Sequence, residues 1–191
     1  MSSRFDDDLG QRPHLGLEIG YVTDRNDPEG LGRVQVCIPG LIEPASPWAW
    51  PLGTSGGGSK NRGFFAVPEV GAEVGVLFAR GDFSAPFYFA GHWAKPAGTS
   101  EVPTEAQKSP PDNRVISTET FSIEMDETKG ARRLKITNRV TEDAICLDAE
   151  QNSLSISGTT AITITAVGAI TLKAPLITIN GRAVKPVADA I

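Results

Sequence analysis

Four carboxylate or amide side chains crowd into the segment TDRNDPEG, residues 23–30, and their types would suit a calcium ion. They are Asp24, Asn26, Asp27 and Glu29. An EF-hand calcium loop needs a glycine at its sixth position and a bidentate glutamate at its twelfth. Counted from Asp24, these positions hold Glu29 and Gln35. The spacing therefore predicts a turn at this segment and no calcium site.

Two further patterns could indicate nucleotide binding or catalysis. The Gly-rich segment GTSGGGSK, residues 53–60, lacks the Gly-Lys-Ser/Thr triplet that a phosphate-binding loop requires after a four-residue gap. Glu69 and Glu73 could act as general acid and base, but glycoside hydrolysis needs a cleft between two carboxylates, which nothing in the sequence indicates. Two histidines, His14 and His92, offer little for a zinc site. We therefore expect no catalytic residues, no cofactor and no metal, and we predict that the protein is not an enzyme.

Composition narrows the class of protein further. The 191 residues include 20 Gly and 14 Pro, which favours frequent turns over long helices. The net charge of −5 argues against a nucleic-acid partner. Neither a signal peptide nor an apolar run long enough to span a bilayer is evident, so we expect synthesis in the cytoplasm. In that compartment Cys37 and Cys146 are expected to be buried thiols rather than a disulfide.

Changes in composition predict four segments. Residues 1–16 are polar and form an N-terminal extension, and residues 17–95 hold all three Trp. Residues 96–114 contain four prolines and have the composition of an extended linker. Residues 115–191 are rich in Ile, Thr and Leu and poor in aromatic residues.

Short β-patterned runs fill residues 17–95. They are LEIGYVTD, GRVQVCIP, SPWAWPLG, FFAVP, AEVGVLFAR and PFYFAGHW. Several short strands in about 80 residues predict a small closed barrel of the OB type, because closure removes exposed strand edges. Alternation in the second run places Val34, Val36 and Ile38 on the inner face. Arg33 begins this run.

A half-buried guanidinium beside a core strand needs a carboxylate or carbonyl partner. We therefore predict that Arg33 forms an ion pair with Glu69 or Glu73. OB barrels also bind single-stranded nucleic acid through exposed aromatic residues. Trp48, Trp50, Phe64 and Phe65 could serve in this way, but they have few basic neighbours, so packing or protein contacts are favoured.

Pairs of apolar residues, each separated by one residue that is usually polar, recur through residues 115–191. The pairs are Ile123/Met125, Leu134/Ile136, Ile145/Leu147, Leu154/Ile156, Ile162/Ile164, Ile170/Leu172 and Ile177/Ile179. Successive pairs begin 11, 11, 9, 8, 8 and 7 residues apart. Each unit has the pattern of one short strand with an apolar side, followed by a turn, and it cannot bury that side alone.

A period near eight residues is too short for one coil of a single chain, whereas three chains would give roughly 24 residues per turn. The pattern predicts an intertwined, triple-stranded β-helix in a homotrimer, so that the whole protein is all-β. The predicted trimer interior comprises Leu154, Ile156, Ile162, Ile164, Ile170, Leu172, Ile177 and Ile179. The alternative is a monomeric antiparallel sandwich of hairpins.

Residues 17–93 resemble the OB-fold domain of spike proteins from contractile tails. That family includes baseplate assembly protein V of tailed phages and the valine-glycine-repeat spikes of type VI secretion. The matching motifs are DPEGLGRVQV, SPWAWPLG, GGGSKNRG, the Pro-Glu-x-Gly-x-Glu-Val run from Pro68 to Val74, and the Gly-Asp-x-x-x-Pro turn from Gly81 to Pro86. The apolar repeats are similar in pattern to the triple-stranded β-helix of the same proteins.

The resemblance implies a homotrimeric central spike in the tail baseplate of a virion or a related contractile injection system. Its barrel would attach to the tail hub, and its β-helix would pierce the outer membrane of the target cell when the sheath contracts. Some relatives bind iron through a terminal His-x-His pair, which the ending NGRAVKPVADAI lacks, so no metal is expected. A separate tip protein could cap that end, and the linker leaves no room for the lysozyme domain of other relatives.

Two competing functions remain open at the level of sequence. The first is a trimeric module that binds a glycan or a receptor through the barrel face. The second, more weakly supported, is a glycan-cleaving enzyme.

Overall fold

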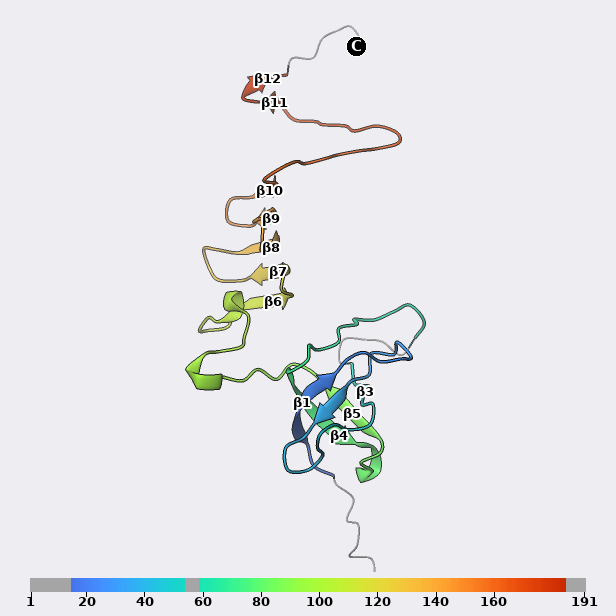
Figure 1. Cartoon of the computed structure of the whole chain (residues 1–191). Coiled ribbons are helices and arrows are strands. Elements are labelled where there is room, and N and C mark those ends of the chain that lie inside the picture. Colours follow the sequence, from blue (N-terminus) through green and yellow to red (C-terminus); the bar gives the residue numbers. More distant parts are fainter. Residues whose placement is uncertain (1–14, 54–58, 185–191) are drawn as a thin grey trace, which may run out of the picture. The chain divides into compact units, whose positions relative to one another are not determined.

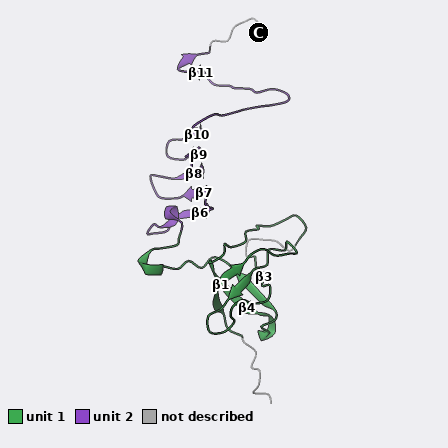
Figure 2. Ribbon diagram, viewed as in Figure 1, with its two compact units in different colours: residues 1–102 green, residues 103–191 purple. Residues whose placement is uncertain are grey.

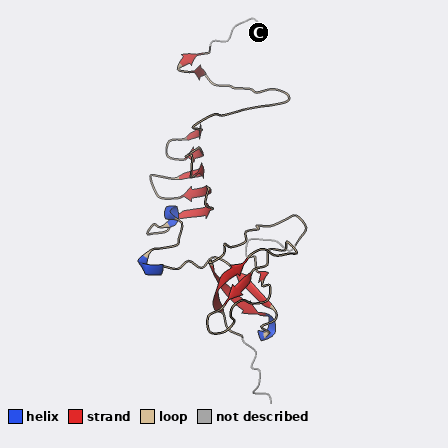
Figure 3. Ribbon diagram, viewed as in Figure 1, coloured by secondary structure: helices blue, strands red, loops and turns tan. Residues whose placement is uncertain are grey.

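The computed structural model describes residues 15–53 and 59–184, which belong to two compact units, residues 1–102 and 103–191 (Figure 2). Both units consist of β-strands, loops and short 3₁₀ turns, and the described residues include no α-helix (Figure 3). The all-β prediction is thus confirmed. None of the helical turns in these ranges has the length and apolar character needed to cross a membrane. Most of the predicted extension, residues 1–16, and of the Gly-rich loop, residues 53–60, lies outside the described residues.

A five-stranded sheet forms the first unit (Figure 1). Its elements are β1 (Glu18–Asp24), β2 (Gln35–Cys37), β3 (Trp50–Pro51), β4 (Glu73–Phe78), the 3₁₀ turn η1 (Ala79–Gly81) and β5 (Pro86–Phe89). The strands pair in the order β2-β1-β4-β5-β3, and only the β3–β5 pair is parallel.

An isolated bridge between Val34 and Ala49 joins the two edges of this sheet. The N–H of Ala49 donates to the carbonyl of Val34 at 2.8 Å, and the N–H of Val34 donates back at 3.2 Å. The sheet therefore closes into the small barrel that the strand pattern predicts.

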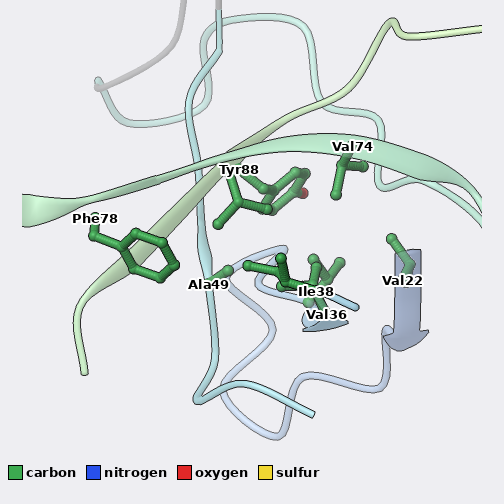
Figure 4. Packing of buried hydrophobic residues seen from close by; sticks show 9 residues of the cluster. Val22, Val36, Ile38, Ala49, Val74, Phe78 and Tyr88 are labelled. Carbon is green, nitrogen blue, oxygen red and sulfur yellow. The ribbon is translucent and has the colours of Figure 1, made fainter. Parts of the chain in front are cut away.

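Buried apolar side chains fill the interior of the barrel (Figure 4). They are Val22, Val34, Val36, Ile38, Ala49, Val74, Val76, Phe78 and Tyr88. The predicted inward face of residues 33–38 is confirmed, since Val34, Val36 and Ile38 are all at most 2% exposed. Burial of a Val or Ile side chain contributes about 1.5–3 kcal/mol, so this cluster supplies much of the stability of the unit.

The prediction of a strand at FFAVP, residues 64–68, is wrong. Instead, the ring of Phe65 lies over Gly32, where a Cβ atom would come within 2.6 Å of the ring. Gly32 also has a φ of +75°, which glycine adopts without steric cost. The hydroxyl of Tyr88 donates a hydrogen bond of 2.7 Å to the carbonyl of Gly32 and so ties this position to the core.

The proline-rich connection is shorter and more structured than the predicted linker, residues 96–114. It contains the 3₁₀ turns η2 (Pro96–Gly98) and η3 (Thr104–Ala106). The boundary between the two units falls after Val102, and β6 begins at Asn113.

An antiparallel meander forms the main part of the second unit (Figure 1). Its strands are β6 (Asn113–Ser117), β7 (Phe121–Asp126), β8 (Arg133–Asn138), β9 (Ala144–Asp148) and β10 (Ser153–Ser157). They follow one another across the sheet in chain order. A separate hairpin pairs β11 (Thr178–Ile179) with β12 (Arg182–Ala183).

This meander corrects the predicted pairing of the repeats. The expectation was that each turn would take one unit from each of three chains, but β6 to β10 pair within one chain, because each turn folds the chain back. The predicted strands at Ile162/Ile164 and Ile170/Leu172 are not strands in the isolated chain. Residues 158–177 form no strand, and at their end the N–H of Val184 donates to the carbonyl of Ile177 at 2.8 Å.

One face of the meander carries a buried polar network. The Nζ of Lys108 donates to Asp126 at 2.8 Å and to the side-chain oxygen of Asn113 at 3.0 Å. The Nδ2 of Asn113 donates to Glu124 at 2.5 Å and to the carbonyl of Glu105 at 2.9 Å. These bonds hold the segment around η3 against β6 and β7.

Candidate functional site

Two features of the described residues could serve a function: the loop that contains Arg33, and the apolar face of the second unit. In the first, the Nε and Nη2 atoms of Arg33 donate to Oδ1 of Asp27 at 3.1 and 2.6 Å. The same Nη2 donates to Glu29 at 2.9 Å. The side chain of Asp27 is only 3% exposed and that of Arg33 10%, so this is a buried ion pair.

Asp27 also organises the backbone of its own loop. Its carboxylate accepts from the backbone N–H of Glu29 at 3.1 Å, Leu31 at 2.8 Å and Arg33 at 3.2 Å. The guanidinium of Arg33 and these N–H groups hold the pKa of Asp27 well below its usual range, against the effect of burial. The loop therefore depends on the ionised form of Asp27.

Two tryptophan rings flank the guanidinium. The Cζ atom of Arg33 lies 5.2 Å from the ring centroid of Trp50 and 5.9 Å from that of Trp48. At these distances both rings contribute cation–π attraction. Bonding to Asp27 raises the pKa of Arg33, so this cation stays charged.

The predicted partners of Arg33 were wrong. Glu69 forms an ion pair with Arg25, and the Oε2 of Glu73 lies 2.6 Å from the Nδ1 of His92. The true partners come from the same loop, because Asp27 and Glu29 lie only a few residues before Arg33 and the loop folds back on itself. The sequence analysis assigned both acids to a turn. The spacing could have indicated the pairing, because Glu29 follows the Asp-Pro dipeptide and lies four residues before Arg33.

The polar atoms of this loop bond mainly to one another. The Nε and Nη2 atoms of Arg33 and both carboxylate oxygens of Asp27 form hydrogen bonds within the loop. The described residues include no group of three or more His, Cys, Asp or Glu that could hold a metal ion. Both cysteines are free thiols and half-buried. The arrangement around Asp27 and Arg33 is a structural lock at the start of the barrel.

The second feature is the apolar face of the meander, which two rows of side chains form across the strands. The Ile row consists of Ile116, Ile123, Ile136, Ile145 and Ile156, one from each strand. The Leu row consists of Met125, Leu134, Leu147 and Leu154. Opposite residues in adjacent strands lie close enough to pack, so the rows are continuous.

Most side chains of the two rows are exposed in the part of the chain that the structure describes. Ile156 is 53% exposed and Leu154 is 63% exposed. The predicted interior residues of the following segment are equally bare, since Ile164 and Leu172 are each 67% exposed. Ile162, Ile170 and Ile179 are exposed and Ile177 is half-buried. Sequence reasoning missed Ile116, which extends the Ile row by one strand.

An open apolar groove continues the face at its C-terminal end. Its volume is about 350 Å³, and its lining includes Phe121, Ile136, Ile145, Ile156 and Ile162. A soluble monomer rarely exposes a continuous apolar surface of this kind, so such surfaces mark sites of association.

The closed barrel and its locked loop define a small OB-type domain. Residues 18–93 match the family described as the type VI secretion system/phage-baseplate injector OB domain. This part of the chain is therefore similar to the OB domain of baseplate injectors, as the sequence motifs predicted. No curated protein matches the chain.

Replacement of Arg33 by alanine should lower the unfolding temperature of the barrel by roughly 10 °C, because it leaves the buried carboxylate of Asp27 without its cation. Tryptophan fluorescence follows this transition directly, since Trp48 and Trp50 flank the guanidinium. The control is Arg25→Ala, which removes an ion pair to the exposed Glu69 and should cost about 2 °C or less. Equal effects of the two substitutions would contradict the lock.

Acid should destabilise the barrel through Asp27. In the unfolded chain this carboxyl binds a proton near pH 4, whereas in the folded protein its pKa is lower and it stays ionised. The contribution of Asp27 to the free energy of unfolding is therefore present above about pH 4 and is lost as the pH falls below that value. The measurement is thermal unfolding of the wild type and of Asp27→Asn along an acid titration. The variant should start less stable and lose less as the pH falls. Parallel curves for the two proteins would refute this role.

Proposed function

We propose that this protein is the central spike of a contractile tail baseplate, located in the tail of a virion or in a related injection machine. The observation that carries the proposal is the uncovered apolar face of the second unit, on a chain whose first unit is similar to a baseplate injector OB domain. The barrel would attach to the tail hub, and the second unit would pierce the outer membrane of the target cell when the sheath contracts.

Three copies would form the spike. Each meander supplies its own backbone ladder, so three meanders can meet through their apolar faces and form the walls of a triangular prism. The Ile and Leu rows of the three chains would then pack against one another in a shared interior from which water is excluded. The proposal retains the predicted homotrimer and the predicted interior residues. It differs in that strands β6 to β10 of each chain form one whole side of the prism, instead of alternating with strands of the other chains.

Residues 158–177 would complete the shaft by pairing between chains. This stretch forms no strand in its own chain, yet it keeps the apolar pairs Ile162/Ile164 and Ile170/Leu172. A period of eight residues suits three chains that each contribute one short strand per turn. We therefore assign the intertwined part of the predicted β-helix to this stretch.

The mechanism is mechanical rather than catalytic. Force from the sheath would pass through the barrel, the connection and the shaft, and a narrow stiff tip would concentrate it on a small area of membrane. The network of Lys108, Asn113, Glu124 and Asp126 supports this path, because it fastens the connection to β6 and β7. No cofactor, metal or nucleic acid takes part.

The substitution Ile156→Asp should abolish the trimer, because three charges would then meet in an apolar interior. The matched control is Ser155→Asp on the same strand, whose position faces away from both rows and should tolerate a carboxylate. Chemical cross-linking of the purified proteins gives the fraction of trimer. A trimer that forms equally well with Ile156→Asp would overturn the prism.

Tail particles from the organism that makes this protein should contain three copies of the chain each. Quantitative mass spectrometry of purified particles, calibrated with labelled peptides of the barrel, measures that number. Absence of the chain from such particles, together with saturable binding of the purified protein to a cell-surface glycan, would replace the spike by the glycan-binding module.

A further inference from the structure

Charge is divided sharply along the second unit. Residues 103–150 carry ten Asp or Glu and seven Lys or Arg. Residues 151–184, here called the C-terminal segment, carry no acidic residue and two cations, Lys173 and Arg182, and the seven residues that follow add Lys185 and Asp189. The division begins at β10, where the surface of the sheet changes from charged to hydroxyl-bearing side chains.

The cations of the two regions also differ in their partners. In residues 103–150, four of the cations pair with carboxylates of the same unit: Lys108 with Asp126, Arg132 with Glu150, Arg133 with Glu124 and Arg139 with Glu105. In the part of the chain that the structure describes, no carboxylate pairs with Lys173 or Arg182, and both side chains are exposed. Among the described residues, neither charge is neutralised by a carboxylate, so both can attract an anion.

The polar positions of the C-terminal segment carry hydroxyl groups almost throughout. On β10 the residues between and beside Leu154 and Ile156 are Ser153, Ser155 and Ser157. Beyond it, Thr163 and Thr171 stand between the apolar residues of their pairs. A hydroxyl group costs far less to move from water toward hydrocarbon than an ionised carboxylate does. An outer surface of Ser and Thr, without acids, therefore suits contact with lipid.

We propose that the C-terminal segment binds an anionic lipid bilayer, with Lys173 and Arg182 contacting lipid phosphates. A carboxylate in this segment would be repelled by such a surface, and none is present, whereas each cation is attracted to it. The proposal rests on the proposed function, since three copies present six cations together around one shaft. Electrostatic attraction then holds the tip at the membrane before force drives it through.

The experiment measures co-sedimentation of the full-length protein with vesicles. One set consists of phosphatidylcholine alone, and the other is an equal mixture of phosphatidylcholine and phosphatidylglycerol. The wild type should bind the mixed vesicles and not the neutral ones, and added salt should weaken the binding. The double variant Lys173→Gln with Arg182→Gln should bind the mixed vesicles roughly tenfold more weakly or worse.

The control variant, Lys60→Gln with Lys129→Gln, removes the same charge from two exposed turns outside the C-terminal segment. It should bind as the wild type does. Equal loss in both variants, or unchanged binding of the Lys173/Arg182 variant, would overturn the inference.

The mass of each protein in solution separates this inference from the proposed function. A trimer of normal mass that ignores anionic vesicles overturns the lipid contact alone. A monomeric wild type overturns the spike itself, whatever the vesicles show.

Discussion

The structure depends on one unmet requirement: no described part of the chain covers the apolar face of the meander. Side chains such as Ile145 and Leu147 stand in continuous rows, and they gain the usual benefit of burial only when another surface excludes water from them. The strands already satisfy one another's backbone groups, so what is missing is an apolar partner rather than a ladder. In the proposed trimer, other copies of the same chain would provide a surface of the same period and chemistry.

The barrel, by contrast, buries its apolar core and pairs the buried charges of Asp27 and Arg33 within the first unit. Arg33 lies between Asp27, Glu29 and two tryptophan rings, while Tyr88 fastens the neighbouring Gly32 to the core. The core cluster and the buried ion pair of Arg33 both lie within the first unit.

Sequence reasoning predicted the barrel well because its signals are local. Alternation in residues 33–38 and the turn residues before them depend on neighbours in the chain, and both are found as expected. It gave Arg33 the wrong partners because ion pairing depends on how a loop folds back, which composition does not encode. The prediction paired Arg33 with Glu69 or Glu73, which are distant in the sequence. The short loop instead brings Asp27 and Glu29 into contact with Arg33.

The same reasoning located the repeats but not their pairing. Alternation identifies which residues share a face, and the rows through Ile136 and Leu134 confirm it, but alternation alone does not decide whether the next strand belongs to the same chain. The mass of the wild-type protein in solution tests the central claim most directly. The account predicts three times 20.3 kDa at all working concentrations. A stable species of 20.3 kDa with a folded second unit would contradict it.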